Sequence, residues 1–135
     1  MREYKFRAWD KKKRKMIYLS PNDTILFQNG KCTVWKENQY DETEECFCCE
    51  TFSNVIPMLY SGRKDKNGEE IYEGDLVMVA DYASWEGLYK VIWDEENLMY
   101  MIEDAYGDRE KLCEFEEYLK KGNIYENLEL LERCI

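Results

Sequence analysis

The sequence predicts a mainly β protein that carries a single C-terminal helix. Polar and apolar side chains alternate near the N-terminus, which is typical of a half-buried strand. Short apolar runs recur along the chain between polar turns, and two of these turns are Asn-Gly pairs, at residues 29–30 and 67–68. We therefore expect N-terminal hairpins followed by a small SH3-like barrel or a curved antiparallel sheet.

The first predicted hairpin lies within residues 3–19. Residues 3–8 show the alternation, and a second apolar stretch, Met16–Leu19, follows the polar segment DKKKRK. The tip of this hairpin carries the basic residues Lys11, Lys12, Lys13, Arg14 and Lys15. Such a cluster can contact phosphate, RNA or an acidic partner, although a lysine-rich turn is often only a solvated loop.

A second hairpin is predicted from Thr24–Gln28 and Lys31–Lys36. The Asn29-Gly30 pair between them suits a type I′ turn, because both central residues of that turn need a positive φ. The polar and acidic residues 37–45 are interpreted as a surface loop. A strand over Val55–Tyr60 follows, and its Pro57 favours an edge or a bulge.

Residues 61–135 are expected to form the barrel-like part. Tight turns are predicted at Asn67-Gly68 and Glu73-Gly74-Asp75. Three strands then follow, at Leu76–Val79, Leu88–Trp93 and Leu98–Ile102. No linker or repeat divides the chain, so residues 1–135 are predicted to be one domain, with the hairpins in residues 1–60.

An amphipathic helix is predicted at about residues 109–121. Asp108 can cap it, Gly122 can end it, and an apolar stripe runs through Leu112, Phe115 and Leu119. Residues 123–131 are predicted to be a final strand.

The net charge of -10 is unevenly distributed. Residues 1–15 carry +6, so the remaining 120 residues carry -16. An acidic body repels the phosphate backbone and suits a basic protein partner, although acidic surfaces also arise for solubility. Nucleic acid is therefore expected to bind, if at all, through the basic hairpin.

The compartment follows from what the sequence lacks. No apolar run approaches the ~18–20 residues that span a bilayer, and the N-terminus has no apolar core of a signal peptide. We expect a cytoplasmic protein without membrane contact. Its six cysteines are then expected to be reduced thiols.

Little in the sequence points to catalysis or to a cofactor. The absence of histidine excludes Ser-His-Asp and Cys-His catalysis and the HExxH zinc hydrolases. Carboxylates cluster at residues 69–75 and 94–96, where an acid-base pair or a magnesium site can be imagined, but both clusters occupy predicted turns. We predict no catalytic residue, no metal site and no cofactor.

Three cysteines lie close together, and a zinc site is one hypothesis for them. Cys46, Cys48 and Cys49 would need a fourth ligand, which Cys32, Cys113 or Cys134 could supply. On a strand, however, Cys46 and Cys48 share a face while Cys49 points away. Buried apolar thiols are the favoured interpretation, with redox or intermolecular disulfide chemistry as the alternative.

Aromatic residues make up 15% of the chain, and some of them are candidates for partner binding. Tyr and Trp dominate protein interfaces because they combine an apolar body with a polar tip. Trp85, in the polar segment DYASWEG, is the preferred exposed candidate, together with Tyr82; a Trp85 that faces the core is the competing interpretation.

Three segments together carry a family resemblance. They are KFRAWDKKKRKMI at residues 5–17, GRKDKNGEEIYEGDLV at residues 62–77 and GNIYENLELL at residues 122–131. In type and order they resemble the conserved blocks of the YopX family, which is encoded by phages and prophages of Gram-positive bacteria. Leu128 and Arg63 depart from the usual pattern, and residues 32–58 and 80–110 carry no resemblance.

The resemblance implies a phage accessory protein inside an infected or lysogenic cell, and it implies no reaction, catalytic residue or cofactor. The sequence therefore favours a non-enzymatic module that binds another protein or itself. One alternative is a regulator that contacts nucleic acid through residues 11–15. The second alternative is an enzyme that depends on carboxylates and a metal.

Overall fold

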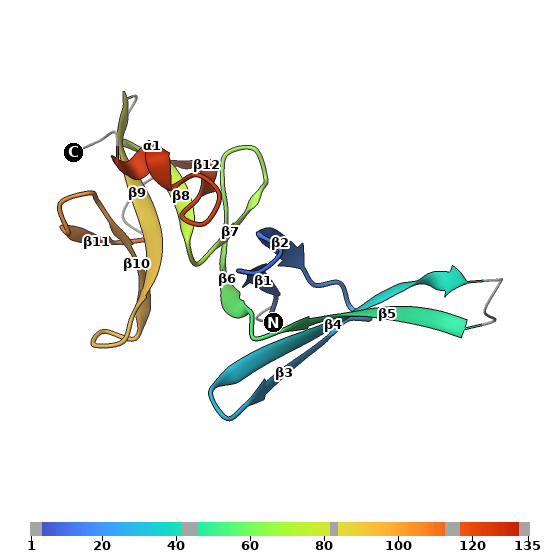
Figure 1. Cartoon of the computed structure of the whole chain (residues 1–135). Helices are drawn as coiled ribbons and strands as arrows, with labels where there is room; N and C mark the ends of the chain where they lie inside the picture. Colours follow the sequence, from blue (N-terminus) through green and yellow to red (C-terminus); the bar gives the residue numbers. More distant parts are fainter. Residues whose placement is uncertain (1–3, 42–45, 82–83, 113–116, 133–135) are drawn as a thin grey trace. The chain divides into compact units, whose positions relative to one another are not determined.

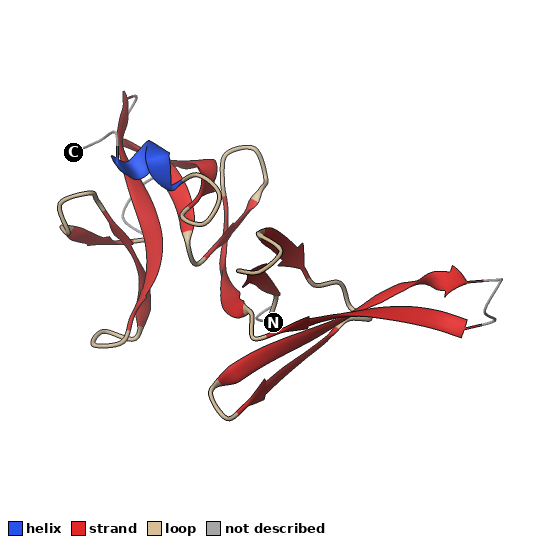
Figure 2. Ribbon diagram, viewed as in Figure 1, coloured by secondary structure: helices blue, strands red, loops and turns tan. Residues whose placement is uncertain are grey.

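The structure is a computed structural model that describes residues 4–41, 46–81, 84–112 and 117–132, with side chains outside 38–49 and 80–86 (Figure 1). The chain forms two compact units, Tyr4–Leu59 and the part from Tyr60 onward. Strands dominate both units, which confirms the mainly β fold class (Figure 2). That residues 1–135 act as one domain stays a prediction.

The first unit contains the predicted N-terminal hairpin. Strand β1 (Phe6–Asp10) pairs antiparallel with β2 (Lys15–Tyr18), and on its other side with the start of β6 (Ile56–Lys64). Every residue of Arg7–Asp10 is buried, so β1 is covered on both faces and is not the half-buried strand that the alternation predicted. Pro57 lies in β6 opposite Ala8.

A three-stranded sheet completes the first unit. Strand β3 (Thr24–Gln28) pairs with β4 (Lys31–Asp41), and β4 pairs with β5 (Cys46–Ser53). Asn29 and Gly30 have φ angles of 53° and 74°, which confirms the predicted hairpin and its turn. The surface loop predicted at residues 37–45 is wrong for residues 37–41, because cross-strand pairing with β5 continues β4 to Asp41; residues 42–45 lie outside the described residues.

One apolar cluster holds this unit together. It joins side chains from β1, β2, β4 and β5 with the residue that immediately precedes β6, and it comprises Ala8, Ile17, Cys32, Val34, Phe52 and Val55. Ile25 of β3 packs against the cluster only partly.

The second unit is built on a curled antiparallel sheet, the curved-sheet alternative of the prediction. Its strand order is β11-β10-β9-β8-β12. The strands are β8 (Asp75–Asp81), β9 (Ser84–Asp94), β10 (Met99–Glu103), β11 (Arg109–Lys111) and β12 (Glu117–Asn123). The short β7 (Glu70–Tyr72) pairs with the end of β6. The core of this unit includes Ile71, Val77, Val79, Val91, Ile102, Leu112 and Tyr118.

The helix predicted at residues 109–121 is wrong. Arg109–Lys111 and Glu117–Asn123 are strands, and residues 113–116 lie outside the described residues. Tyr118 and Leu119 pair with Val79 and Met78 of β8, so a place beside a buried strand outweighs the local helical pattern. Gly122 lies at a register shift in β12 instead of ending a helix.

The predicted final strand at residues 123–131 is also wrong. β12 ends at Asn123, and the helix α1 (Leu128–Glu132) starts five residues later. The Asn123 side chain accepts hydrogen bonds from the backbone N–H groups of Tyr125 and Glu126, so it folds the backbone into a turn. Asn127 then lies immediately before α1, where Asn is favoured.

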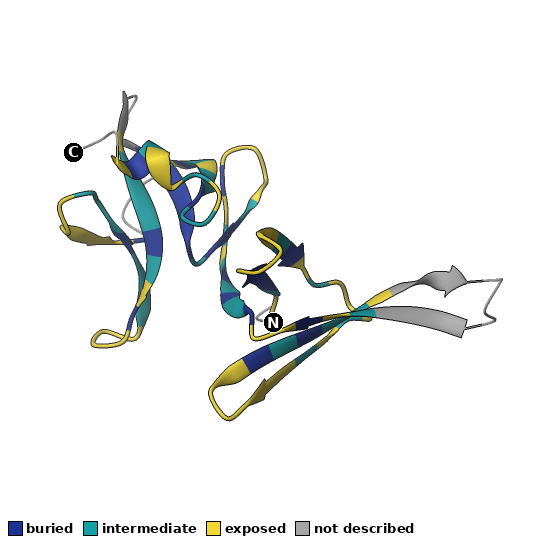
Figure 3. Cartoon of the chain, in the orientation of Figure 1, coloured by how far each residue is buried: buried dark blue, intermediate teal, exposed yellow. Residues whose placement is uncertain are grey.

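Within the described ranges, no helix is long and apolar enough to cross a membrane. The buried residues concentrate in the central strands of each unit, whereas the β3 strand and many turns are exposed (Figure 3).

Candidate interaction surface

The basic hairpin keeps only part of its charge available to a partner. The Asp10 carboxylate accepts hydrogen bonds from the backbone N–H groups of Lys12 and Lys13, at 2.9 and 3.2 Å, and thereby fixes the tip. Residues 11–15 are all exposed. The structure thus confirms the hairpin and the position of the cluster at its tip.

Two lysines of the cluster pack against the sheet. The Nζ atoms of Lys13 and Lys15 lie 4.5 and 5.7 Å from the centroid of the Phe52 ring, within the range of cation–π attraction. Lys13 also lies 3.5 Å from a carboxylate oxygen of Glu50. Among the described residues, Lys11, Lys12 and Arg14 show no such contact, so they are the part of the cluster that can meet a ligand.

The hairpin is connected to β3 through a buried carboxylate. The Asp23 side chain is fully buried and accepts hydrogen bonds from the N–H groups of Ser20 and Glu37, both at 2.8 Å, and from Lys36 Nζ at 2.9 Å. Burial opposes ionisation, but these hydrogen bonds outweigh it and lower the pKa of Asp23 to about 2. Asp23 therefore fixes the chain immediately before β3 begins.

The structure does not describe the side chains of two predicted partner-binding residues. Tyr82 falls outside the described residues. The backbone of Trp85 lies in β9 and pairs with Ala80, so the polar segment that contains Trp85, which lay between two predicted strands, is itself partly strand; the Trp85 side chain is not described. The cysteine side chains at 46, 48, 49, 113 and 134 are not described either, so the thiol and zinc hypotheses stay open there.

The carboxylates of the central block are used to shape its turns. Asp65 is buried and accepts hydrogen bonds from the backbone N–H groups of Asn67 at 2.8 Å, Glu69 at 2.9 Å and Lys120 at 3.1 Å. Burial opposes its ionisation, but the three N–H donors lower the pKa of Asp65. One side chain thus holds the Asn67-Gly68 turn against β12.

Asp75 plays the same part at the next turn. Its fully buried carboxylate accepts the Tyr72 N–H at 2.8 Å and lies 3.3 Å from Lys120 Nζ. Lys120 also donates to the Glu70 carbonyl at 3.2 Å. The carboxylates that the sequence placed in turns are therefore partly buried in the scaffold, and this group does not line the hollow described below.

The other carboxylate cluster is organised in the same way. Asp94 accepts hydrogen bonds from the Asn97 side chain at 2.9 Å and from the Glu96 N–H at 3.0 Å, and the Asn97 side chain is the main reason that the pKa of Asp94 is lowered. Within the described ranges, no group of three His, Cys, Asp or Glu side chains is placed to hold a metal ion.

Two neighbouring apolar side chains of the first unit are left exposed on β3. Leu26 and Phe27 are 44% and 55% exposed, although both belong to a regular strand. Among the described residues β3 pairs only with β4, so its other side is an open edge of the sheet. No residue of Thr24–Gln28 is charged, whereas natural edge strands commonly carry Lys or Pro that discourages pairing.

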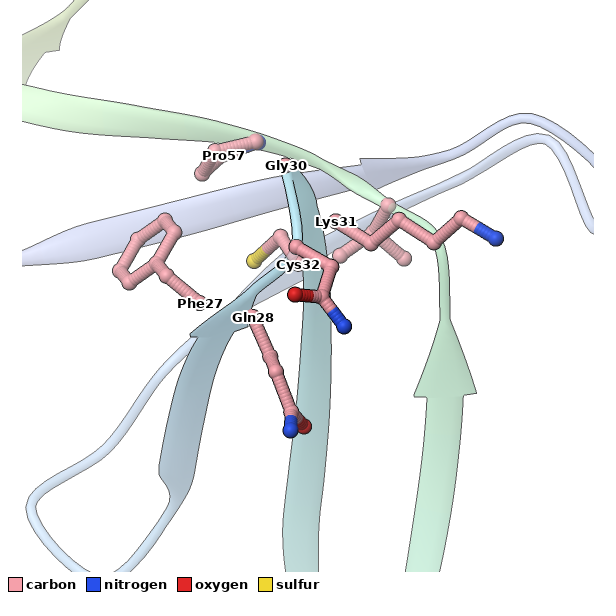
Figure 4. A pocket seen from close by; sticks show the side chains of 8 residues that line it. Phe27, Gln28, Gly30, Lys31, Cys32 and Pro57 are labelled. Carbon is pink, nitrogen blue, oxygen red and sulfur yellow. The ribbon is translucent and has the colours of Figure 1, made fainter.

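A hollow of about 280 Å³ adjoins this edge at the end of the hairpin (Figure 4). Phe27, Val55 and Pro57 supply its apolar walls. Residues 28–32 complete the lining, and the polar ends of Gln28 and Lys31 point away from Phe27 and Pro57 in Figure 4. The hollow therefore offers an apolar recess beside a strand edge.

Cys32 lines this recess, and its thiol has low reactivity. It pairs with Phe27 across the hairpin, is 3% exposed, and its sulfur points toward Phe27 (Figure 4). Burial raises the pKa of the Cys32 thiol, so the thiol stays protonated and acts as a small apolar group.

Comparison with known proteins places the chain in a family. Residues 5–132 match the YopX protein family. The chain belongs to the YopX family. The match includes the three segments that carry the resemblance in the sequence, and it extends over the intervening residues.

Solved structures of similar chains support the family fold. Protein EF1440 from Enterococcus faecalis is 26% identical, with a TM-score of 0.64, over 97% of this chain and 99% of that one. Protein yopX from Bacillus subtilis is 20% identical, with a TM-score of 0.62, over 94% and 95% of the two chains, and this likeness shows the fold alone. A search of the curated proteins found no match.

The two units of this YopX-family chain differ sharply in charge. Residues 60–135 hold 20 acidic and nine basic residues, a net charge of -11, whereas residues 4–59 carry nine basic and eight acidic residues. All nine basic residues of the first unit lie in residues 4–36, where only two acidic residues accompany them. The segment that contains the hairpin and β3 therefore carries +7.

Sequence reasoning predicted β3 with its correct bounds but did not single out its exposed side chains. A signal was present: Ile25, Leu26 and Phe27 are three consecutive apolar residues in a strand, so at least one of them must leave the core face. The absence of charge from the strand was the second signal.

Proposed function

We propose that this YopX-family chain is a phage or prophage accessory protein that acts in the cytoplasm of the bacterial host by binding another protein, without catalysing a reaction. The family resemblance supports the phage origin. The observation that carries the binding role is the uncharged, exposed edge strand β3 with the recess beside Phe27.

An open edge strand binds a partner by adding the partner's strand to the sheet. The backbone hydrogen bonds of such a pair give affinity, and pockets for individual side chains give specificity. β3 offers both parts, since its edge is open and the recess adjoins Phe27. The partner expected here supplies an extended, uncharged segment with an apolar side chain that reaches the recess.

The use of the charged residues supports a role without catalysis. A general acid or base must reach a substrate, but Asp65 and Asp75 are buried and accept backbone N–H groups. In the second unit, Lys90 and Arg109 both form ion pairs with Glu103.

Affinity capture from host lysate tests this proposal with three forms of the chain. Leu26→Lys places a charge at the open edge, and Leu98→Lys makes the same change at a position that is 72% exposed in the second unit. A partner should be captured by the wild type and by Leu98→Lys, and lost with Leu26→Lys. The partner is then purified and its affinity for the three forms is measured by calorimetry; equal affinity for all three removes β3 as the binding surface.

A second candidate function is nucleic-acid contact through the hairpin tip, favoured by the exposure of Lys11, Lys12 and Arg14 within a segment of charge +7. Each phosphate contact contributes about one to the slope of log affinity against log salt. Replacing these three residues by Ala should reduce that slope by about two to three, whereas replacing Lys13 and Lys15 should reduce it less. An affinity for DNA and RNA that shows no salt slope would end this candidate.

A further inference from the structure

The side chains of β3 are arranged symmetrically about Leu26. Polar Thr24 and Gln28 stand at the two ends, and apolar Ile25 and Phe27 flank the centre. A strand with this pattern presents the same order of side chains when its direction is reversed. It is therefore self-complementary in an antiparallel pair.

The hydrogen-bond pattern of the hairpin has the same symmetry. In a two-residue hairpin, the residues that flank the turn form a hydrogen-bonded pair, here Gln28 and Lys31. Because bonded and non-bonded pairs alternate, Leu26 also directs its backbone groups toward β4. Ile25 and Phe27 then direct their N–H and C=O groups toward the open edge.

We propose that a second copy of this chain is a partner of the edge, and that two copies pair antiparallel along β3 with Leu26 opposite Leu26. This inference rests on the proposed function, since it assigns the partner of the same surface. Ile25 of each copy stands opposite Phe27 of the other, and each such pair exchanges two backbone hydrogen bonds. The two three-stranded sheets become one six-stranded sheet.

The pair covers the side chains that the single chain exposes. On one face, Phe27 meets Ile25 of the second copy next to the recess, and on the other face the two Leu26 side chains meet at the twofold axis. Leu26 is at a non-bonded position of the new pair, where Cα atoms approach to about 4.5 Å and side chains contact closely. The exposed apolar area of β3 is thereby removed from water.

No like charges are brought together by this register. Residues that sum to 52 in number stand opposite each other, so Asp23 aligns with Asn29 and Lys31 with Pro21. The net charge of -10 on each copy opposes association at long range, and salt screens that repulsion. A pair of five-residue strands buries less than a standard interface, so we expect a weak dimer with a dissociation constant of about 10⁻⁴ M.

Sedimentation velocity on the intact chain, from about 10 to about 500 μM, tests the pairing. The wild type and Leu98→Lys should show the same shift from monomer to dimer. Leu26→Lys should weaken the dimer more than tenfold, because it sets two lysines against each other at the twofold axis. Added salt should strengthen the wild-type dimer; a dimer that salt weakens is held by ion pairs and contradicts the proposal.

A disulfide cross-link reports the register itself. Leu26→Cys places two sulfur-bearing side chains at a Cα separation that a disulfide accepts. Mild oxidation followed by peptide mapping should find the introduced thiol joined to the same introduced thiol of a second chain, distinguished by mass from links between the native cysteines. Ser53→Cys, an exposed position on β5 at the opposite side of the same sheet, serves as the control and should form no comparable link.

The outcomes separate this inference from the proposed function. A wild type that stays monomeric up to 500 μM overturns the self-pairing, while a lysate partner that is lost with Leu26→Lys still supports the binding role of β3. A dimer that Leu26→Lys leaves intact also overturns it, since the contact then lies elsewhere. If Leu26→Lys changes neither association nor capture, both proposals fail.

Discussion

The turns of the second unit and the β3 edge of the first use side chains in opposite ways. In the turns, buried Asp65 and Asp75 accept backbone N–H groups and hold the chain in place. On β3, Leu26 and Phe27 stay about half exposed in a regular strand, although the Phe27 ring also contacts Phe6. The first arrangement stabilises the fold, and the second leaves surface that contributes little to the fold.

This difference indicates what the three family segments contribute to the protein. The polar residues of the central and C-terminal segments, including Asp65, Asp75 and Asn123, fix turns and strand starts. β3 lies outside all three segments. We infer that the three segments encode the scaffold, and that partner binding falls to a strand outside them.

Replacing Asp75 by Ala should give the largest loss of stability among the turn residues. The change leaves Lys120, a largely buried cation 3.3 Å away, without this carboxylate, and leaves the Tyr72 N–H without its acceptor. Losses of this kind cost about 4 kcal/mol of the free energy of unfolding, measured by urea titration. Asp108→Ala, at an exposed position, is the control and should change less than ~0.5 kcal/mol. Equal losses of stability in the two variants would show that the contacts of Asp75 do not stabilise the fold.

Gly122→Ala should be the next most damaging change. A Cβ at this position would clash with Asn127 Oδ1, the atom that accepts the Asn123 N–H. Displacing Asn127 loses that hydrogen bond and disturbs the start of α1, which should cost about 2–3 kcal/mol. At Gly107 a Cβ meets no atom within 4 Å, so Gly107→Ala should cost only the strain of its φ of 91°, about 1 kcal/mol. Thermal unfolding of both variants measures the difference, and a milder Gly122→Ala would contradict the assignment.

Lowering the pH should reduce the stability that Asp23 contributes to the fold beside β3. Because the folded pKa of about 2 lies below the usual 3.8, ionised Asp23 stabilises the fold above pH ~4. This stabilisation, about 2 kcal/mol, is lost as the pH falls from about 4 to about 2. Unfolding free energies of wild type and Asp23→Asn at several pH values should converge toward pH 2. Parallel curves would mean that Asp23 titrates at its ordinary pKa.

The sequence predictions were correct where local interactions determine an element, and wrong where pairing with a distant strand determines it. The Asn29-Gly30 turn fixed the β3–β4 hairpin locally, so its strands were predicted with correct positions. The helix at residues 109–121 failed because Tyr118 and Leu119 pair with β8, about 40 residues away in the sequence. Alternation along β3 indicates only that one of Ile25, Leu26 and Phe27 leaves the core face; that Phe27 is also exposed depends on which strands flank β3.

The smallest effect on stability is expected at β3 itself, and it decides whether the strand is surface or scaffold. Leu26→Lys replaces a side chain that is already 44% exposed, so the unfolding free energy should change by less than ~0.5 kcal/mol. Val34→Ala, on the neighbouring strand, removes methyl groups from a fully buried position and should cost about 2 kcal/mol. Urea titration at low protein concentration keeps association out of both values. If Leu26→Lys lowers the unfolding free energy as much as Val34→Ala does, Leu26 stabilises the fold of the single chain. The exposed apolar residues of β3 would then be explained without a binding partner.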